Sequence, residues 1–292
     1  MVQSEVRVLT ASDQERLQAF LEQDLDRGLI LYSNITRAGL SDGGRTFEGT
    51  YAAYLVAGEI VAVAGHFWNG MLLVQGDKKL PELTSLCLSE TRRPMTGVLG
   101  PRPNVESLSR LFADQGFRLR QSMPQELMVL DMEALATPQA LTRPDVICRR
   151  PRSSEIDLLS NWRVDQERET LDRADDPKLR RNSRTRIERS HGEKSLWVLE
   201  QNGRIVANCE IVARAGDRVQ IGNVRTPPAY RNQGFARAVI AGALGQLRNL
   251  GIKRAILFVH DPAAKRAYQA LGFSKVGDFA LEFWERCDEL VA

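Results

Sequence analysis

The sequence lacks several features that would restrict its function class directly. No apolar run approaches the ~18 residues of a membrane-spanning helix, so no membrane segment is expected. The four cysteines lie far apart without a Cys-x-x-Cys pair, and the three histidines are also dispersed. This spacing argues against a disulfide framework and against a metal site. With no basic, apolar leader at the start, we expect a cytoplasmic protein that needs no metal.

Length and charge divide the chain into two parts. A chain of 292 residues predicts two domains, and we place the boundary near residues 141–144, where Pro138 and Pro144 interrupt the pattern. The expected domains are 1–141 and 142–292. Residues 1–141 carry 13 Lys and Arg and 17 Asp and Glu, so this part is acidic. Residues 142–292 carry 27 Lys and Arg and 20 Asp and Glu, so this part is basic. The basic second half favours an anionic ligand there.

The pattern of apolar and turn residues predicts a mixed α/β protein. In the first half we expect helices at 11–27, 81–88 and 105–115, strands at 51–57, 59–66, 71–75 and 95–99, and a loop over 28–50 that leaves room for a short helix at 29–36. In the second half we expect a strand starting at Val146, helices at 153–171, 233–249 and 262–271, and strands at 196–200, 204–213, 218–226, 255–259 and 279–284.

The stretch Val224–Ala236 is the most informative part of the sequence. An extended apolar run breaks at Pro227-Pro228 and enters a long amphipathic helix through Arg231-x-x-Gly234-x-Ala236. The first N–H groups of a helix have no partner inside the helix, and the helix dipole makes this end attractive to anions. Small residues let the main chain approach a ligand closely. The stretch therefore predicts a site for a pyrophosphate.

These residues resemble the acyl-coenzyme A signature of the GNAT superfamily of N-acetyltransferases, R/Q-x-x-G-x-G/A. A second family signature is similar to Asp261-x-x-Ala264-x-x-x-Tyr268-x-x-x-Gly272-Phe273, with Asp261 where relatives usually carry Asn. The resemblance covers about residues 146–286. It implies a mostly antiparallel mixed sheet flanked by helices, and direct transfer of an acetyl group from acetyl-coenzyme A (acetyl-CoA) to an amine.

The resemblance also implies roles for individual residues. The residues expected to bind the coenzyme are Val224, Arg225, Thr226, Arg231, Asn232, Gln233, Gly234, Phe235, Ala236, Arg237 and Asp261. Tyr268 is the expected general acid, which would protonate the departing thiolate. The signature strand, 219–226, contains neither Glu nor His, so the candidate base is Glu210 on the preceding strand. Glu167 and Glu169 are further candidates, and an amine deprotonated in solution would need no base.

An internal repeat links the two halves. Gly58-Glu59-Ile60-Val61-Ala62 is similar to Gly203-Arg204-Ile205-Val206-Ala207, at an offset of 145 residues. The pattern of residues 105–117 is similar to that of 261–273 at an offset of 156, so the missing residues fall where the second half has its phosphate loop. We therefore interpret residues 1–141 as a degenerate GNAT-like lobe without a cofactor loop.

Two other functions stay open at this stage. The chain could be a non-catalytic sensor or partner module that binds an acyl-coenzyme A. The basic run 178–189 could bind nucleic acid, but no aromatic residues accompany the charges, and a solvated helix is the preferred interpretation. We expect Cys209 to be a core residue and His260 to be structural. The acceptor is expected to be a small-molecule or peptide amine, and a homodimer is not excluded.

Overall fold

The computed structural model describes residues 3–287 and divides into two compact units. Of the described residues, unit 1 comprises 3–128, Phe258–His260 and 275–287. Unit 2 comprises Val129–Leu257 and Asp261–Ser274. No helix among the described residues has the length and apolar character needed to cross a membrane.

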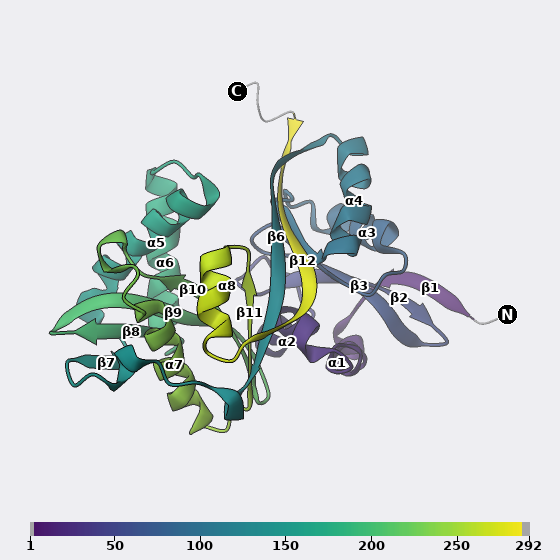
Figure 1. Cartoon of the computed structure of the whole chain (residues 1–292). Helices are drawn as coiled ribbons and strands as arrows, with labels where there is room; N and C mark the ends of the chain where they lie inside the picture. The colour runs from purple at the N-terminus through teal and green to yellow at the C-terminus, as the bar shows by residue number, and fades with distance from the viewer. Residues whose placement is uncertain (1–2, 288–292) are drawn as a thin grey trace. The chain divides into compact units, whose positions relative to one another are not determined.

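Unit 1 contains one sheet with helices on both faces (Figure 1). Its elements are β1 (Ser4–Val8), α1 (Gln14–Glu22), α2 (Leu25–Ala38), β2 (Gly49–Val56), β3 (Glu59–Phe67), β4 (Met71–Gln75), α3 (Leu80–Thr91), β5 (Gly97–Pro101), α4 (Arg102–Asp114), β6 (Phe117–Asp131) and β12 (Ser274–Arg286). The strand order is β1-β2-β3-β4-β5-β12-β6. The β4–β5 pair is parallel, as expected for strands joined through a helix.

Two hydrophobic clusters cover the two faces of this sheet. Helices α1 and α2 contribute Leu17, Leu21 and Ile35 to one cluster. Helices α3 and α4 contribute Leu83 and Phe112 to the other. Successive strand side chains point to opposite faces, so the central strands β2, β3, β4 and β5 contribute to both clusters.

Unit 2 repeats this arrangement with a shorter sheet (Figure 1). Its elements are β7 (Val146–Arg149), α5 (Ile156–Leu171), α6 (Pro177–Gly192), β8 (Leu196–Gln201), β9 (Arg204–Ala215), β10 (Arg218–Arg225), α7 (Phe235–Arg248), β11 (Arg254–Val259) and α8 (Pro262–Gln269). The strand order is β11-β10-β9-β8-β7, with β10 and β11 parallel. Helices α5 and α6 pack on one face through Trp162, Ile187 and Val198. Helix α7 covers the other face, where Gln246 accepts a hydrogen bond of 3.2 Å from Trp197 Nε1.

The two units share an irregularity in their first hairpins. The β2–β3 ladder shifts register between Tyr54 and Leu55, and the β8–β9 ladder shifts between Leu199 and Glu200. These positions differ by the same 145 residues as the sequence repeat. Both hairpins also turn through two residues with positive φ, Ala57-Gly58 and Asn202-Gly203. Because hairpin register follows from local turn geometry, a shared shift at the same offset supports the expected tandem arrangement.

The compact units differ from the two expected domains, 1–141 and 142–292. The last strand, β12, pairs with β5 of unit 1 from Phe279↔Pro101 to Phe283↔Gly97, and Trp284 packs in the core of that unit. The first part of unit 1 also ends at Met128, inside β6, and this lies before the expected boundary at residue 141. A boundary drawn from proline positions marks a loop in the chain, but it cannot reveal where a distant strand is inserted.

Some expected elements need correction. The predicted helix 11–27 is divided, since α1 ends at Glu22 and α2 starts at Leu25. Helix α2 continues to Ala38, through the first part of the expected loop 28–50 and the short helix considered at 29–36. Strands β1 and β6 were not predicted, because both carry charged or polar residues at many positions. In unit 2 the predicted order of helices and strands is confirmed, with shifts of a few residues at the ends.

Candidate active site

The junction between β10 and α7 has the geometry expected of an anion site. Gly234 is the N-cap of α7 with φ of 78°, and Asn232 also has a positive φ of 64°. The first main-chain bond into the helix runs from Ala238 N to Gly234 O at 3.0 Å. Among the described residues, none accepts a hydrogen bond from the N–H groups of residues 233–237. These five groups are free to bind an anionic ligand.

The surroundings of this turn fit a diphosphate and its attached arm. A Cβ at Gly234 would meet nothing closer than Arg237 Nη2 at 3.4 Å, so it is the left-handed φ of this turn, and not lack of space, that favours glycine there. Phe235 is only 1% exposed and anchors the helix in the core. The hydroxyl of Thr226 is buried and has no hydrogen-bond partner among the described residues. Such an atom usually binds water or a ligand.

The arginine of the signature is tied to α5. Arg231 Nη2 donates to Glu169 Oε1 at 2.5 Å, and Arg231 Nε donates to the carbonyl of Thr226 at 3.1 Å. Arg225 Nη1 donates to the other oxygen of Glu169 at 3.0 Å. Arg231, followed by Arg225, lowers the pKa of Glu169 below its ordinary value. Glu169 is therefore an ionised anchor between the two arginines, and not an available base.

Strand β10 contains a β-bulge just before this loop. Its ladder with β9 pairs Gly222 with Glu210 and Arg225 with Asn208, so β10 has one residue more than β9 in this interval. The bulge falls at Asn223 and Val224, and Asn223 has a φ of 48°. Sequence reasoning missed it, although Gly222-Asn223 inside an otherwise apolar strand is a recognised signal of such an interruption.

Glu210 is buried beside the bulge and is engaged on both oxygens. The residue is 4% exposed. Ser190 Oγ donates to Oε1 at 2.6 Å, Asn223 Nδ2 donates to Oε2, and Arg186 lies 3.5 Å from Oε2. Burial alone would raise the pKa of Glu210, but Arg186 and the hydrogen bonds outweigh it, so the pKa is lowered. The carboxylate is ionised and held in place.

The other carboxylate considered as a base is also paired. Glu167 Oε1 accepts a 2.5 Å hydrogen bond from Arg163 Nη2, and Arg173 lies 3.1 Å from Oε2. Arg163 in turn donates to the side chain of Asn223, which connects α5 with the bulge. No sequence motif indicated Arg163, because an arginine on a helix can have many roles at the protein surface and does not by itself indicate one of them.

The second signature forms helix α8. Asp261 is its N-cap, and Oδ1 accepts a 2.6 Å hydrogen bond from Ala264 N, as expected for an aspartate in this position. Tyr268 is half-buried, and its ring lies 6.2 Å from that of Phe273. Burial raises the pKa of Tyr268 above its ordinary value, with further contributions from Cys209 and Asp261. The phenol therefore keeps its proton at neutral pH.

Other expectations concern residues outside this chemistry. Cys209 is fully buried, and burial raises the pKa of its thiol well above the ordinary value, as expected for a core residue. Several charges of the run 178–189 are paired, including Arg180 with Asp175 at 2.6 Å and Arg184 with Glu188 at 2.8 Å. All four cysteines are free, and the described residues contain no cluster of three or more His, Cys, Asp or Glu suited to a metal.

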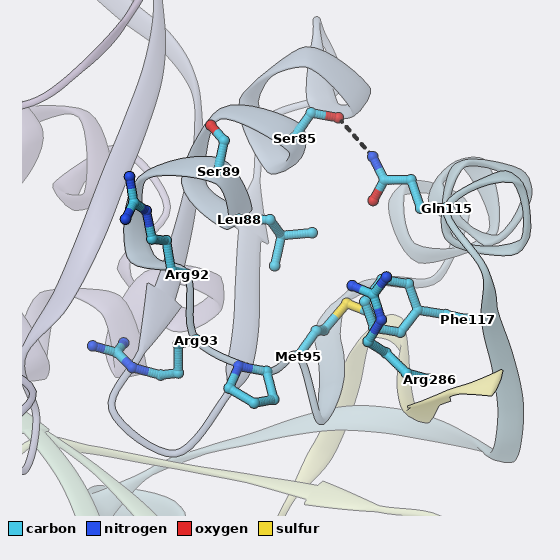
Figure 2. A pocket seen from close by; sticks show the side chains of 10 residues that line it. Ser85, Leu88, Ser89, Arg92, Arg93, Met95, Gln115, Phe117 and Arg286 are labelled. Carbon is cyan, nitrogen blue, oxygen red and sulfur yellow. Dashed lines mark hydrogen bonds between the residues drawn. The ribbon is translucent and has the colours of Figure 1, made fainter. Parts of the chain in front are cut away.

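Unit 1 lacks the features of the phosphate loop. The connection from β4 to α3 spans only residues 76–79, and Lys79 at the helix N-cap pairs with Glu82 at 2.7 Å. Pro81 has no N–H to offer, and Glu82 places a negative charge in the first turn. Figure 2 shows a separate hollow of about 570 Å³ in this unit, where Ser85 and Gln115 are hydrogen-bonded across α3 and α4.

Comparison with known proteins agrees with this geometry. Residues 156–273 match the Acetyltransferase (GNAT) family. No curated protein sequence matches the chain. A GCN5-related N-acetyltransferase of Sphaerobacter thermophilus superposes with a TM-score of 0.57 at 17% identity, covering 97% of this chain and 95% of its own. A Drosophila protein superposes with a TM-score of 0.69 at 13% identity, and the superposition covers 96% of this chain and 98% of the Drosophila protein.

A tandem protein is also among the similar structures. The tandem GNAT protein from the clavulanic acid biosynthesis pathway has a TM-score of 0.58 at 11% identity, covering 97% of this chain and 98% of its own. The likeness extends over both units, whereas the family match is confined to the part of the chain that carries the phosphate loop. Residues 156–273 thus match the GNAT acetyltransferase family, within a chain whose fold is similar to that of a tandem GNAT protein.

Proposed function

We propose that the chain is an N-acetyltransferase that transfers an acetyl group from acetyl-CoA directly to an amine, within unit 2. The observation that carries this proposal is the row of five unpartnered N–H groups at residues 233–237, next to Gly234 in a left-handed conformation. The adjoining Thr226 hydroxyl, which is buried and unpartnered, supports a ligand running from the loop along β10. The proposed acceptor is a small-molecule or peptide amine.

The chain's residues would perform three tasks. When bound, acetyl-CoA supplies the acetyl group as an activated thioester. The N–H groups of residues 233–237 would hold the diphosphate, and the main chain of Val224 and Thr226 would align the arm. Tyr268 would give its phenolic proton to the departing sulfur as the new C–N bond forms and the C–S bond breaks, and the proton that the amine nitrogen loses would return through water to the Tyr268 phenolate. The amine would enter deprotonated, because Glu167, Glu169 and Glu210 are all engaged by arginines.

Calorimetry with acetyl-CoA and a Gly234→Ala variant tests the proposal. A Cβ in the left-handed conformation costs about 1–2 kcal/mol, and any relaxation of that strain would reorient the N–H groups. We expect wild-type protein to bind acetyl-CoA and the variant to bind it about tenfold or more weakly. Gly216→Ala is the matched control, since Gly216 has φ of 53° in an open turn between β9 and β10. Equal affinities in both variants would contradict the assignment of the loop.

A non-catalytic coenzyme sensor is the second candidate. It is favoured by one observation, the absence of an unpaired carboxylate among the three considered as bases. A panel of primary amines incubated with acetyl-CoA separates the two, with release of free thiol as the readout. Acetylation of any amine above the background rate supports the enzyme. Tight coenzyme binding with no acetylation across peptides, polyamines and amino sugars supports the sensor.

A further inference from the structure

A second hollow of unit 1 lies at the ends of its two parallel strands, β4 and β5. Its volume is about 510 Å³, and the residues that line it all belong to unit 1. Gln75 ends β4 and Pro101 ends β5, and residues of α1, α2, α4 and β12 line the rest. In unit 2 the parallel pair is β10 and β11, and β10 leads into the proposed coenzyme loop. The hollow therefore lies where α/β sheets commonly bind ligands, at the carboxyl ends of parallel strands.

The amide of Gln75 is an unpaired polar group at this hollow. Gln75 is 8% exposed, and its Oε1 is buried without a hydrogen-bond partner. No other interaction joins its amide to the described residues. Leaving a buried amide unpaired is unfavourable, and such a group usually binds water or a ligand. Because Gln75 lines the hollow, a ligand there would supply the missing hydrogen bond.

Helix α2 makes room for this amide. Gly28 is buried within the helix, and a Cβ at this position would meet Gln75 Oε1 at 2.7 Å. Glycine inside a helix is unfavourable relative to alanine. Two locally unfavourable choices, a helix glycine and an unpaired buried amide, thus lie against each other. Such departures from ordinary packing are expected at functional sites.

The charges around the hollow favour a cation. The charged side chains that line it are three carboxylates and one guanidinium, those of Asp24, Asp77, Asp278 and Arg27. Arg27 Nη1 donates to Asp24 Oδ2 at 2.5 Å, so this pair is internally neutral. Asp278 lies 2.8 Å from Lys275 and 3.6 Å from Arg102. Asp77 is exposed and has no ion pair or hydrogen bond with the described residues, so its charge is available to a ligand.

Other features of the lining argue against a phosphate and for an aliphatic chain. Pro103 is the second residue of α4 and removes an N–H group from the helix start, where an anion would otherwise bind. The carbonyl of Gly76 is already occupied by Asn104 Nδ2 at 2.5 Å. Phe20 and Pro101 add apolar surface, and an aromatic face attracts an ammonium group.

We propose that this hollow of unit 1 binds a small aliphatic amine, with Gln75 accepting a hydrogen bond from its nitrogen, Asp77 pairing with its charge and Phe20 packing on its carbon chain. An amide oxygen and a carboxylate are both acceptors, which matches the donors of an ammonium group. The proposal goes beyond acetyl transfer, because it concerns unit 1 alone and needs no coenzyme. It gives the lobe without a phosphate loop a ligand of its own.

Calorimetry of the full chain with putrescine (1,4-diaminobutane), in the absence of acetyl-CoA, tests the site. We expect wild type to bind putrescine with a Kd below about 1 mM. 1,4-Butanediol has the same carbon chain with uncharged ends and should bind at least tenfold more weakly. Gln75→Leu removes the amide and should weaken putrescine binding about tenfold or more. Asp77→Asn should weaken it about threefold, because an exposed charge pair contributes little.

A matched variant and a melting experiment separate binding from folding. Gln220→Leu makes the same substitution at another buried glutamine with an unpartnered Oε1, on β10 of unit 2, and should leave the putrescine affinity unchanged. Because Gln75 has no hydrogen bond to lose, Gln75→Leu should melt at or above the temperature of wild type. A purely structural amide would instead give a lower melting temperature in this variant.

Three results would overturn the inference. The first is the same putrescine isotherm in wild type and Gln75→Leu, which would place the amine elsewhere. The second is the absence of putrescine binding by wild type. The third is an equal affinity for butanediol, or for magnesium chloride at the same ionic strength, which would show that the hollow does not recognise an amine. None of them bears on acetyl transfer in unit 2, which the Gly234→Ala variant tests separately.

Discussion

At the scale of single residues, the titratable groups of unit 2 fall into two kinds, carboxylates that stay ionised and a phenol that stays protonated. Glu169 and Glu210 have lowered pKa values because arginines and hydrogen-bond donors surround them. Tyr268 has a raised pKa because burial disfavours its phenolate. A proton donor with a raised pKa remains protonated throughout the neutral range. Of the candidates for acid–base chemistry, Tyr268 is thus the one whose protonation state suits its proposed role.

Replacing Tyr268 with Phe should separate chemistry from binding. The ring still packs near Phe273, but the donor to the departing thiolate is lost. We expect kcat to fall by about 10²-fold or more, with the affinity for acetyl-CoA unchanged in calorimetry. Because the pKa of Tyr268 is raised, wild-type kcat should show no alkaline loss from this group below about pH 10. A wild-type kcat in the variant would remove Tyr268 from the mechanism.

Because His66 is buried in unit 1, we expect the protein to lose stability in mild acid. It is fully buried, with Nδ1 2.7 Å from Thr91 Oγ1, and burial followed by repulsion from Arg93 lowers its pKa to about 4. Between pH 6.5 and 4 the unfolded chain binds a proton that the folded chain does not, so stability falls as pH falls. From pH 7 to pH 5 this costs about 2 kcal/mol.

Chemical denaturation at the two pH values measures this cost. A folded His66→Gln variant should lose about 2 kcal/mol less than wild type over the same interval, because it removes the titrating group. Leu250→Ala, at an exposed position without a titrating group, provides the control and should leave the pH dependence of unfolding unchanged. An identical pH dependence in wild type and His66→Gln would contradict the assignment.

At the scale of elements, the turn between β10 and α7 and the strand–helix order of unit 2 were predictable, because both depend on local sequence. The N-terminal part of unit 1 was less so. Gly28 favoured a loop over a helix, yet it lies inside α2, where a Cβ would meet Gln75 Oε1 at 2.7 Å. The bulge at Asn223 and its contact with Arg163 were also not predictable. They depend on residues 60 positions apart, which no periodicity connects.

Strand β12 should contribute strongly to the stability of unit 1. Trp284 is buried in the cluster formed by α3 and α4, with its ring 5.2 Å from that of Phe112, and its Nε1 donates to Glu282 at 3.1 Å. We expect Trp284→Ala to destabilise the protein by roughly 3–5 kcal/mol in denaturant unfolding. Leu250→Ala is the control, because Leu250 is 68% exposed and should cost little. Equal stabilities would mean that β12 does not form this core.

At the scale of the whole molecule, the structural likeness extends over more of the chain than the family match does. The structural likeness to GNAT proteins covers 97% of the chain, while the family match covers only residues 156–273. Unit 1 keeps the hairpin register and the helix layers but not the phosphate loop. A fold can be retained for packing after a site is lost, which supports the interpretation of a degenerate lobe.

An experiment with fragments of the chain tests whether unit 1 needs β12 in order to fold. Residues 1–141 produced alone would expose the edge of β5 that β12 covers, and we expect this fragment to aggregate or to lack a cooperative melting transition. The same fragment with residues 274–287 attached through a Gly-Ser linker should regain one. Two fragments with the same melting behaviour would show that β12 is dispensable. Attaching residues 196–209 instead, a stretch of unit 2, provides the control for added length.

The position of β12 has a consequence for how the protein is made. Ribosomes deliver a chain from its N-terminus, and most domains can fold as soon as they have emerged. Here the core around Phe112 waits for Trp284, which is translated 172 residues later. The nascent first half must therefore persist with an unfinished sheet edge until β12 has been translated. Premature termination between residue 141 and the start of β12 would leave that edge open, which makes chaperone demand and sensitivity to truncation properties of the topology itself.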